Sequence, residues 1–242
     1  MSKNEILALL PSASNGAVVV LSGGLDSTVS MRLAVEKYGA AKVTAISFFY
    51  GQRQHVELRR AAESCARLGV AHKIVDLEFL KAINQGFSSN VDAGMTMPTI
   101  KDVIGDPQPS TYVANRNMIM MSIAAALAET TGVNTVICGL QANDNYNYHD
   151  TTPQWVGKLN SLLDENRKLG ITVVAPFVSL SKVEEIRAVL ELDGNLDLLA
   201  STLTCYNPTA AGESCGVCPS CAERLQAFAK VGVEDPIKYA KA

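Results

Sequence analysis

One short stretch constrains the fold of this chain more than any other. It is Ser22-Gly23-Gly24-Leu25-Asp26-Ser27, named here the glycine turn (residues 22–27). Residues 17–21 before it form an apolar, β-branched run of strand length. Residues 28–38 after it carry apolar side chains at helical spacing and stop at Gly39. The glycine turn is therefore predicted to join a strand to a helix.

A turn of this kind is suited to an anion. Glycines allow a sharp bend and a close approach by a ligand. The N–H groups that open a helix have no helical partner and stand at the positive end of its dipole. Ser22, Ser27 and Thr28 add hydroxyl groups, so we expect phosphate or pyrophosphate here. The alternative is a plain tight turn in which Asp26 caps the helix. A Walker A loop is excluded because no lysine follows the glycines, and the G-x-G-x-x-G spacing of dinucleotide sites is absent.

The rest of the chain alternates between strand and helix patterns. Strands are predicted at 17–21, 42–50, 72–76, 133–139 and 171–175. Helices are predicted at 4–10, 28–38, 55–68, 116–130 and 153–168. A further helix begins after a capping box from Ser181 to Glu184 and ends at Leu192, and the last begins at Pro219. This order predicts an α/β fold with a doubly wound parallel sheet. Residues 81–112 interrupt it with a long polar stretch containing glycine and proline. That stretch is either a loop that closes over a ligand or a simple insertion. We expect one nucleotide-binding domain over 1–200 and a smaller segment over 201–242.

Composition narrows the functional classes. The chain has 242 residues, a net charge of −3 and a hydrophobic fraction of 48%. An acidic balance argues against a nucleic-acid or membrane-surface partner. No apolar run reaches the length of a membrane span, and the N-terminus lacks the layout of a signal peptide. We therefore expect a cytoplasmic protein that acts on a small molecule.

Four of the six cysteines are grouped near the end of the chain. Cys205, Cys215, Cys218 and Cys221 follow the pattern C-x9-C-x2-C-x2-C. Four thiolates at such spacing suit a structural zinc ion with bonds of about 2.3 Å. An iron–sulfur cluster is the main alternative, because similar cysteine runs hold such clusters, and disulfides are disfavoured. The spacing predicts a zinc site with these four ligands.

Other polar residues are candidates for a site. Residues 141–152 form a polar loop that contains His149 and follows the fourth strand, at the sheet edge where parallel sheets bind ligands. Arg116 and Asn117 open a helix that is otherwise apolar. Lys182 begins a helix, where the dipole disfavours a cation, and this favours a functional role over a surface one.

These motifs together resemble the 7-cyano-7-deazaguanine synthase (QueC) family, within the PP-loop ATP pyrophosphatases. The similarity runs from about residue 17 to residue 226. Its motifs are LSGGLDST at 21–28, FYGQR at 49–53, Arg116-Asn117, Gly139 with Asp144, Tyr148 and Asp150, APF at 175–177, LSK at 180–182, TLTCYN at 202–207 and CGVCPSC at 215–221. The chain differs from the family pattern in two places. Ala114-Asn115 stands where proline and glycine are usual, and residues 146–152 have lost a cysteine and an arginine.

The resemblance implies a homodimeric enzyme that uses ATP, magnesium and zinc. Such an enzyme adenylates 7-carboxy-7-deazaguanine, releases pyrophosphate, and combines the activated acid with ammonia to form an amide and then a nitrile. Asp26, Arg116 and Lys182 are the expected catalytic residues. The residues expected to hold ATP are Leu21, Ser22, Gly23, Gly24, Leu25, Asp26, Ser27, Thr28 and Val29. The expected substrate-binding residues are Tyr50, Gln52, Arg53, Asn117, Asp144, Tyr148, His149 and Asp150. The alternatives are an enzyme that stops at the amide or uses another amine, such as a protein terminus, and a nucleotide-binding module without catalysis.

Overall fold

Five parallel strands form the sheet of this computed structural model, in the order β3-β2-β1-β4-β5. The structure describes residues 1–53, 56–103, 105–106, 108–142, 148–166 and 168–240. The strands are β1 (Ala17–Val20), β2 (Val43–Phe49), β3 (Ala71–Asp76), β4 (Thr135–Cys138) and β5 (Thr172–Val174). The central strand β1 is buried on both faces, as its run of apolar residues predicts. Register pairs Val19 with Ala45 on one side and with Ile137 on the other.

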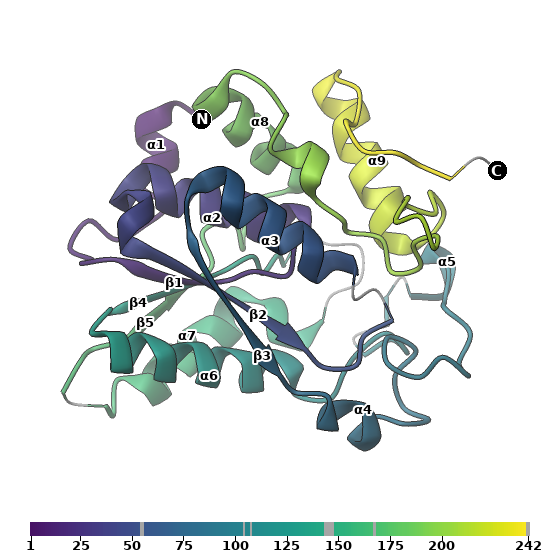
Figure 1. The fold of residues 1–242 in the computed structure, drawn as a ribbon, viewed down its shortest axis with the longest axis horizontal. Helices are drawn as coiled ribbons and strands as arrows, with labels where there is room; N and C mark the ends of the chain where they lie inside the picture. Colours follow the sequence, from purple (N-terminus) through teal and green to yellow (C-terminus); the bar gives the residue numbers. More distant parts are fainter. Residues whose placement is uncertain (54–55, 104, 107, 143–147, 167, 241–242) are drawn as a thin grey trace.

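Helices cover both faces of the sheet, which confirms the doubly wound α/β fold (Figure 1). One face packs against α1 (Lys3–Leu7), α2 (Leu25–Tyr38), α3 (Val56–Leu68), α8 (Lys182–Asp193) and α9 (Pro219–Val231). The other face packs against α6 (Arg116–Thr131) and α7 (Pro153–Leu163). Successive strand residues point to opposite faces, so Val19 belongs to the first core and Val18 to the second. None of the described helices combines the length and the hydropathy that a membrane span requires.

Two parts of the chain differ from the sequence prediction. The helix predicted over 153–168 ends at Leu163, because the following residues 164–168 offer no apolar side chain to bury. Residues 81–112, predicted as a closing loop or a simple insertion, contain helical structure in their described part. Short helices α4 (Phe79–Ile83) and α5 (Ile100–Val103) flank and interrupt this stretch. Buried Asn90 donates to the carbonyl of Thr111 at 2.6 Å, which joins two parts of this stretch.

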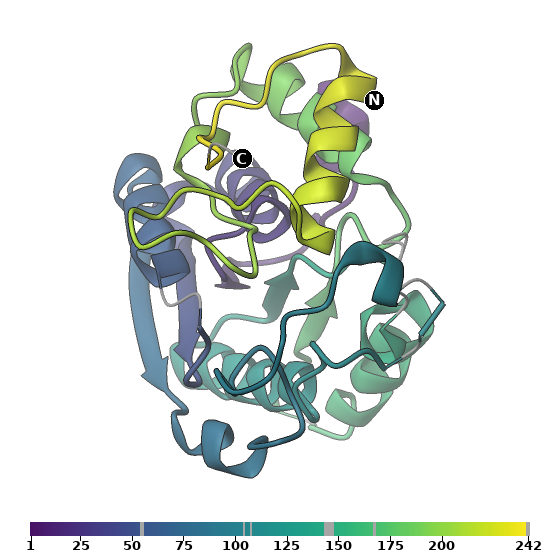
Figure 2. The same ribbon diagram turned by 90° about the vertical axis from the view of Figure 1, so that its right-hand side faces the viewer.

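The strand order places a topological switch point at β1 and β4. From β1 the chain proceeds to β2 and β3 on one side, and β4 and β5 extend the sheet on the other. In open parallel sheets, ligands bind beyond the carboxyl ends of the strands at this point. The glycine turn follows β1 directly and Gly139 follows β4. Figure 2 shows the C-terminal segment and residues 81–112 on this same side of the sheet.

Candidate active site at the switch point

The glycine turn has a geometry that only glycine can provide. Helix α2 begins at Leu25, and Gly24 is its N-cap, so Asp26 stands in the first turn and is not the cap. Gly23 has a φ of +90°, and a Cβ there would lie 2.1 Å from the carbonyl oxygen of Glu57. A Cβ on Gly139 would lie 2.5 Å from the backbone nitrogen of Ser27. Close packing of the turn against β4 and α3 therefore requires both glycines.

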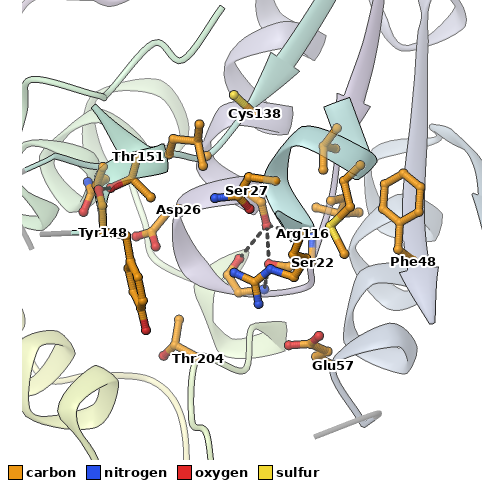
Figure 3. Close-up of a pocket in the computed structure, with 18 of the residues that line it drawn as sticks. Ser22, Asp26, Ser27, Phe48, Glu57, Arg116, Cys138, Tyr148, Thr151 and Thr204 are labelled. Carbon is orange, nitrogen blue, oxygen red and sulfur yellow. Dashed lines mark hydrogen bonds between the residues drawn. The ribbon is translucent and has the colours of Figure 1, made fainter. Parts of the chain in front are cut away.

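Two serine hydroxyls hold the turn in shape from within (Figure 3). The Ser27 hydroxyl accepts from the backbone N–H of Ser22 at 3.2 Å and lies 3.0 Å from the Ser22 hydroxyl. The Ser22 hydroxyl in turn accepts from the N–H of Gly24 at 3.2 Å. An anion that enters the site would compete with these internal bonds for the same amides.

A cavity lies beside the turn and is lined by elements far apart in the sequence. Its polar and charged lining residues are Ser22, Asp26, Ser27, Tyr50, Glu57, Arg116, Asn117, Gln141, Tyr148, Thr151, Thr204, Tyr206 and Ser220. Four of the lining residues, including Leu203, belong to the C-terminal segment. The backbone N–H of Leu203 donates to the carbonyl of Gly23 at 2.9 Å. The cysteine-rich segment therefore forms one wall of the cavity and is bonded directly to the glycine turn.

Lys182 is buried beside this cavity, and its side chain points toward the carboxylate of Asp26. Its ammonium lies 3.1 Å from Oδ1 of Asp26 and donates to Oε1 of Gln141 at 3.1 Å. The capping box predicted from Ser181 to Glu184 is present and fixes the start of α8. The ammonium of Lys182 is therefore held next to the first turn of α2, although the dipole of α8 disfavours a cation at the start of that helix.

Arg116 extends from the start of α6 into the cavity. It donates to the hydroxyl of Tyr50 at 3.1 Å, and its guanidinium lies 5.5 Å from the centre of that ring. Desolvation acts to lower the pKa of Arg116, but the nearby Tyr50, Tyr148 and Asp150 raise it above its ordinary value, so the group stays charged. Burial also raises the pKa of Asp150, although Arg116 opposes that shift. Tyr50, which follows β2, and Tyr148, which precedes a short helical turn at His149–Thr151, lie with this cation in the cavity and can receive an anionic molecule.

The unusual Ala114-Asn115 pair keeps the backbone shape that glycine would give. Asn115 is the N-cap of α6 and has a φ of +52°. Among the described residues it is the one non-glycine residue with a positive φ. Asparagine tolerates the left-handed region better than most residues. Asn115 therefore adopts the left-handed conformation that the usual glycine would adopt, and α6 still begins at Arg116.

The structure places the other expected substrate residues in two groups. Tyr50, Asn117 and Tyr148 line the cavity. Asp150 is buried just behind it, and its carbonyl accepts from Asn117 at 3.5 Å. The ring of His149 packs against that of Tyr112 at a tilt of 56°, with ring centres 5.3 Å apart.

Two further expectations concern the YGQR motif and the loop after β4. Arg53 points away from the cavity and donates to the carbonyls of Ser89 and Met95, so it anchors residues 81–112. Gln52 is buried and bonds the residues around it, including Glu57. Asp144 lies outside the described residues.

Several cavity residues were not anticipated from the sequence. Glu57 is half-buried in the first turn of α3, in a stretch rich in surface charges, and no local sequence pattern marks it as a cavity residue. Thr204, Tyr206 and Ser220 were attributed to the metal segment alone. Thr204 and Tyr206 belong to the TLTCYN motif and Ser220 to the CGVCPSC motif, and membership in these motifs is the signal that could have placed them at the site.

The four cysteines converge as their spacing predicts. Their sulfur atoms all lie within 4.8 Å of one another, and Cys215 and Cys221 have sulfurs 4.0 Å apart. Tetrahedral zinc with bonds of about 2.3 Å needs sulfurs about 3.8 Å apart, so the set fits that ion. Backbone N–H groups of Asn207 and Cys215 donate to the sulfur of Cys205 at 3.3 and 3.2 Å. Such donors favour the thiolate form that binds a metal.

The fold and the glycine turn define an α/β protein of the PP-loop class. The family model described as "Queuosine biosynthesis protein QueC" matches residues 16–232. The 7-cyano-7-deazaguanine synthase of Marinomonas sp. is 37% identical over 226 residues, which cover 93% of this chain and 99% of that protein. The synthase of Chromohalobacter salexigens is 39% identical over 232 residues, covering 96% and 89%. The chain belongs to the QueC family.

A solved structure also aligns with most of the chain. The NMN synthetase from Francisella tularensis superposes with a TM-score of 0.48 at 18% identity, covering 96% of this chain and 80% of that one.

Proposed function

We propose that this protein is an ATP-dependent ligase that converts 7-carboxy-7-deazaguanine and ammonia to 7-cyano-7-deazaguanine. The observation that carries the proposal is the family match over residues 16–232, joined to relatives that bear the name of this synthase. The same relatives favour the nitrile product over the amide, over another amine acceptor and over a module without catalysis. Cytoplasmic location and a homodimer remain predictions of the family resemblance.

The chemistry requires that a carboxylate be made reactive. Attack of the acid on the α-phosphate of ATP forms an acyl adenylate and releases pyrophosphate. Ammonia then displaces AMP to give the amide, and a second adenylation on the amide oxygen allows loss of AMP to leave the nitrile. Charge builds on the departing phosphates, so donors and cations fixed in advance around them lower the barrier.

The residues beside the cavity support this proposal. The backbone amides at the start of α2, and the ammonium of Lys182 that pairs with Asp26 in its first turn, would hold the phosphates. Asp26 is the carboxylate there that would hold a magnesium ion, which screens the charge on the phosphates. Arg116 and Tyr50 line the same cavity and are suited to the carboxylate of the substrate.

We infer that the cysteine site holds zinc, and that the zinc affects the reaction only by fixing the position of the residues beside it. Cys205 follows Thr204 by one residue, and Thr204 lines the cavity. A closed shell of four thiolates leaves no position for substrate. The metal would instead fix the segment that Leu203 bonds to the glycine turn.

Incubation with the acid, ATP and ammonia, followed by mass spectrometry, tests the proposal. The expected result is loss of the acid, transient amide, and accumulation of the nitrile with AMP and pyrophosphate. An unchanged acid would overturn the proposal. Accumulation of the amide alone would overturn the nitrile product while leaving the adenylation in place.

A further inference from the structure

An unanticipated carboxylate, Glu57, lies on the wall of the cavity. It stands in the first turn of α3, and its side chain is among those that line the cavity (Figure 3). The close approach of Gly23 to the Glu57 carbonyl joins α3 to the glycine turn at this point. The acid is thus built into the same wall as the predicted phosphate site.

One carboxylate oxygen of Glu57 is held and the other faces the cavity. Gln52 donates from Nε2 to Oε1 of Glu57 at 3.1 Å. Gln52 is itself fixed, because its Oε1 accepts from the N–H of Tyr50 at 2.8 Å and its Nε2 also donates to the carbonyl of Phe48 at 3.0 Å. No described residue donates a hydrogen bond to Oε2 of Glu57, so this oxygen is available to a molecule in the cavity.

The electrostatic surroundings give Glu57 the character of a base. Burial raises its pKa to about 7, while the bond from Gln52 and the charge of Arg116 oppose that rise. The charged and titratable groups that face it are Arg116 of α6 and the Tyr50 hydroxyl after β2, and burial raises the pKa of Tyr50 further. A carboxyl group tuned to neutral pH can take a proton and release it within one turnover.

The proposed reaction has a step that needs such a base. When ammonia adds to the acyl adenylate, a C–N bond forms and the nitrogen becomes positively charged. It must lose a proton before the C–O bond to AMP breaks, with the electron pair leaving on the phosphate oxygen. Of the residues assigned above, Lys182 and Arg116 are cations, and Asp26 is paired with Lys182 and assigned to magnesium, so the proton needs another acceptor.

We propose that Glu57 is a catalytic residue that binds the attacking ammonia and accepts its proton. This inference rests on the proposed ligase function. Oε2 of Glu57 takes the proton from nitrogen, and the acid returns it to water when the product leaves. Gln52 is the positioning residue that holds the other oxygen in place.

The test compares E57Q with wild type and with E63Q. Glu63 lies on the same helix but is exposed and pairs with Arg60, so its substitution controls for loss of charge on α3. Two rates are measured for each protein. One is acid-dependent exchange of labelled pyrophosphate into ATP without ammonia, and the other is amide and nitrile formation against free ammonia at several pH values.

The expected result separates the two half-reactions. E57Q keeps pyrophosphate exchange within about threefold of wild type but loses about 100-fold in kcat/KM for ammonia. Wild type and E63Q show a rise in that parameter through pH about 7, where the carboxyl loses its proton, and E57Q does not. Hydroxylamine is a weaker base than ammonia, so its adduct loses the proton to water without help from Glu57, and hydroxamate formation by E57Q stays close to that of wild type.

Other outcomes overturn the inference. Equal loss of exchange and ammonia use by E57Q would assign Glu57 to substrate binding or to folding. A pH rise that persists in E57Q would show that another group is the base. If E57Q does not fold, E57D serves instead, and it must keep the pH-dependent rise. Wild type without pyrophosphate exchange would overturn the proposed function and this inference together.

Discussion

Replacing Lys182 with methionine should separate activity from stability. Lys182 is 7% exposed, and its ammonium contacts Asp26 and Gln141 at 3.1 Å each. Methionine keeps most of the side-chain length and removes the charge. A charge-assisted hydrogen bond contributes about 1.5–3 kcal/mol to stability, while relief of the desolvation of a buried ammonium offsets that loss. The Asp26 side chain is 24% exposed and can be hydrated, so the free energy of unfolding should change by no more than about 2 kcal/mol.

The effect on the rate should be much larger. A fixed cation aimed at charge that develops in the transition state is worth about 2.7–4 kcal/mol, or 100- to 1,000-fold in kcat. Urea denaturation measures the stability of Lys182→Met, and pyrophosphate release measures its rate. Lys158→Met on the exposed face of α7 is the matched control and should leave both unchanged. A well-folded Lys182→Met that retains more than about a tenth of wild-type activity would refute the phosphate role of this lysine.

Three further predictions follow from backbone shape and from the cysteines. Gly23→Ala should lower the free energy of unfolding by about 2–4 kcal/mol in urea denaturation, because of its φ of +90° and the 2.1 Å contact; an unchanged midpoint would contradict that geometry. Asn115→Ala should cost about 1 kcal/mol and Asn115→Gly almost nothing, by the same assay; equal effects would argue against the left-handed N-cap. Cys218→Ser should reduce bound zinc, measured by elemental analysis, from about one ion per chain to a small fraction; full retention would exclude this cysteine as a ligand.

Local sequence patterns were sufficient for most of the fold. Apolar runs marked β1, β2, β4 and β5, and the mostly exposed β3 was also predicted. The capping box at Ser181 and the proline at 219 marked helix starts to the residue. Helix α7 was predicted too long, because the polar residues after Leu163 are compatible with a helix but provide nothing for it to bury. Propensity alone therefore did not determine where that helix ends.

The site was harder to predict, because it depends on contacts between distant segments. Motifs placed Asp26 and Arg116 at the cavity, since each directly follows a predicted element boundary at the ligand side of the sheet. Arg53 belongs to a motif of the same kind, yet its guanidinium is used to hold residues 81–112. Glu57 lies in a helix whose other charges are on the surface. Only its packing against Gly23 turns it toward the cavity, and no local pattern encodes that contact.

The central claim is that the acid is activated on the α-phosphate of ATP beside the glycine turn. Its most direct test uses 7-carboxy-7-deazaguanine whose carboxylate carries the heavy isotope of oxygen, with mass analysis of the nucleotide released. Activation by adenylation transfers one heavy oxygen from the acid to AMP for each amide formed. Unlabelled AMP, or heavy oxygen found in inorganic phosphate beside ADP, would contradict the account.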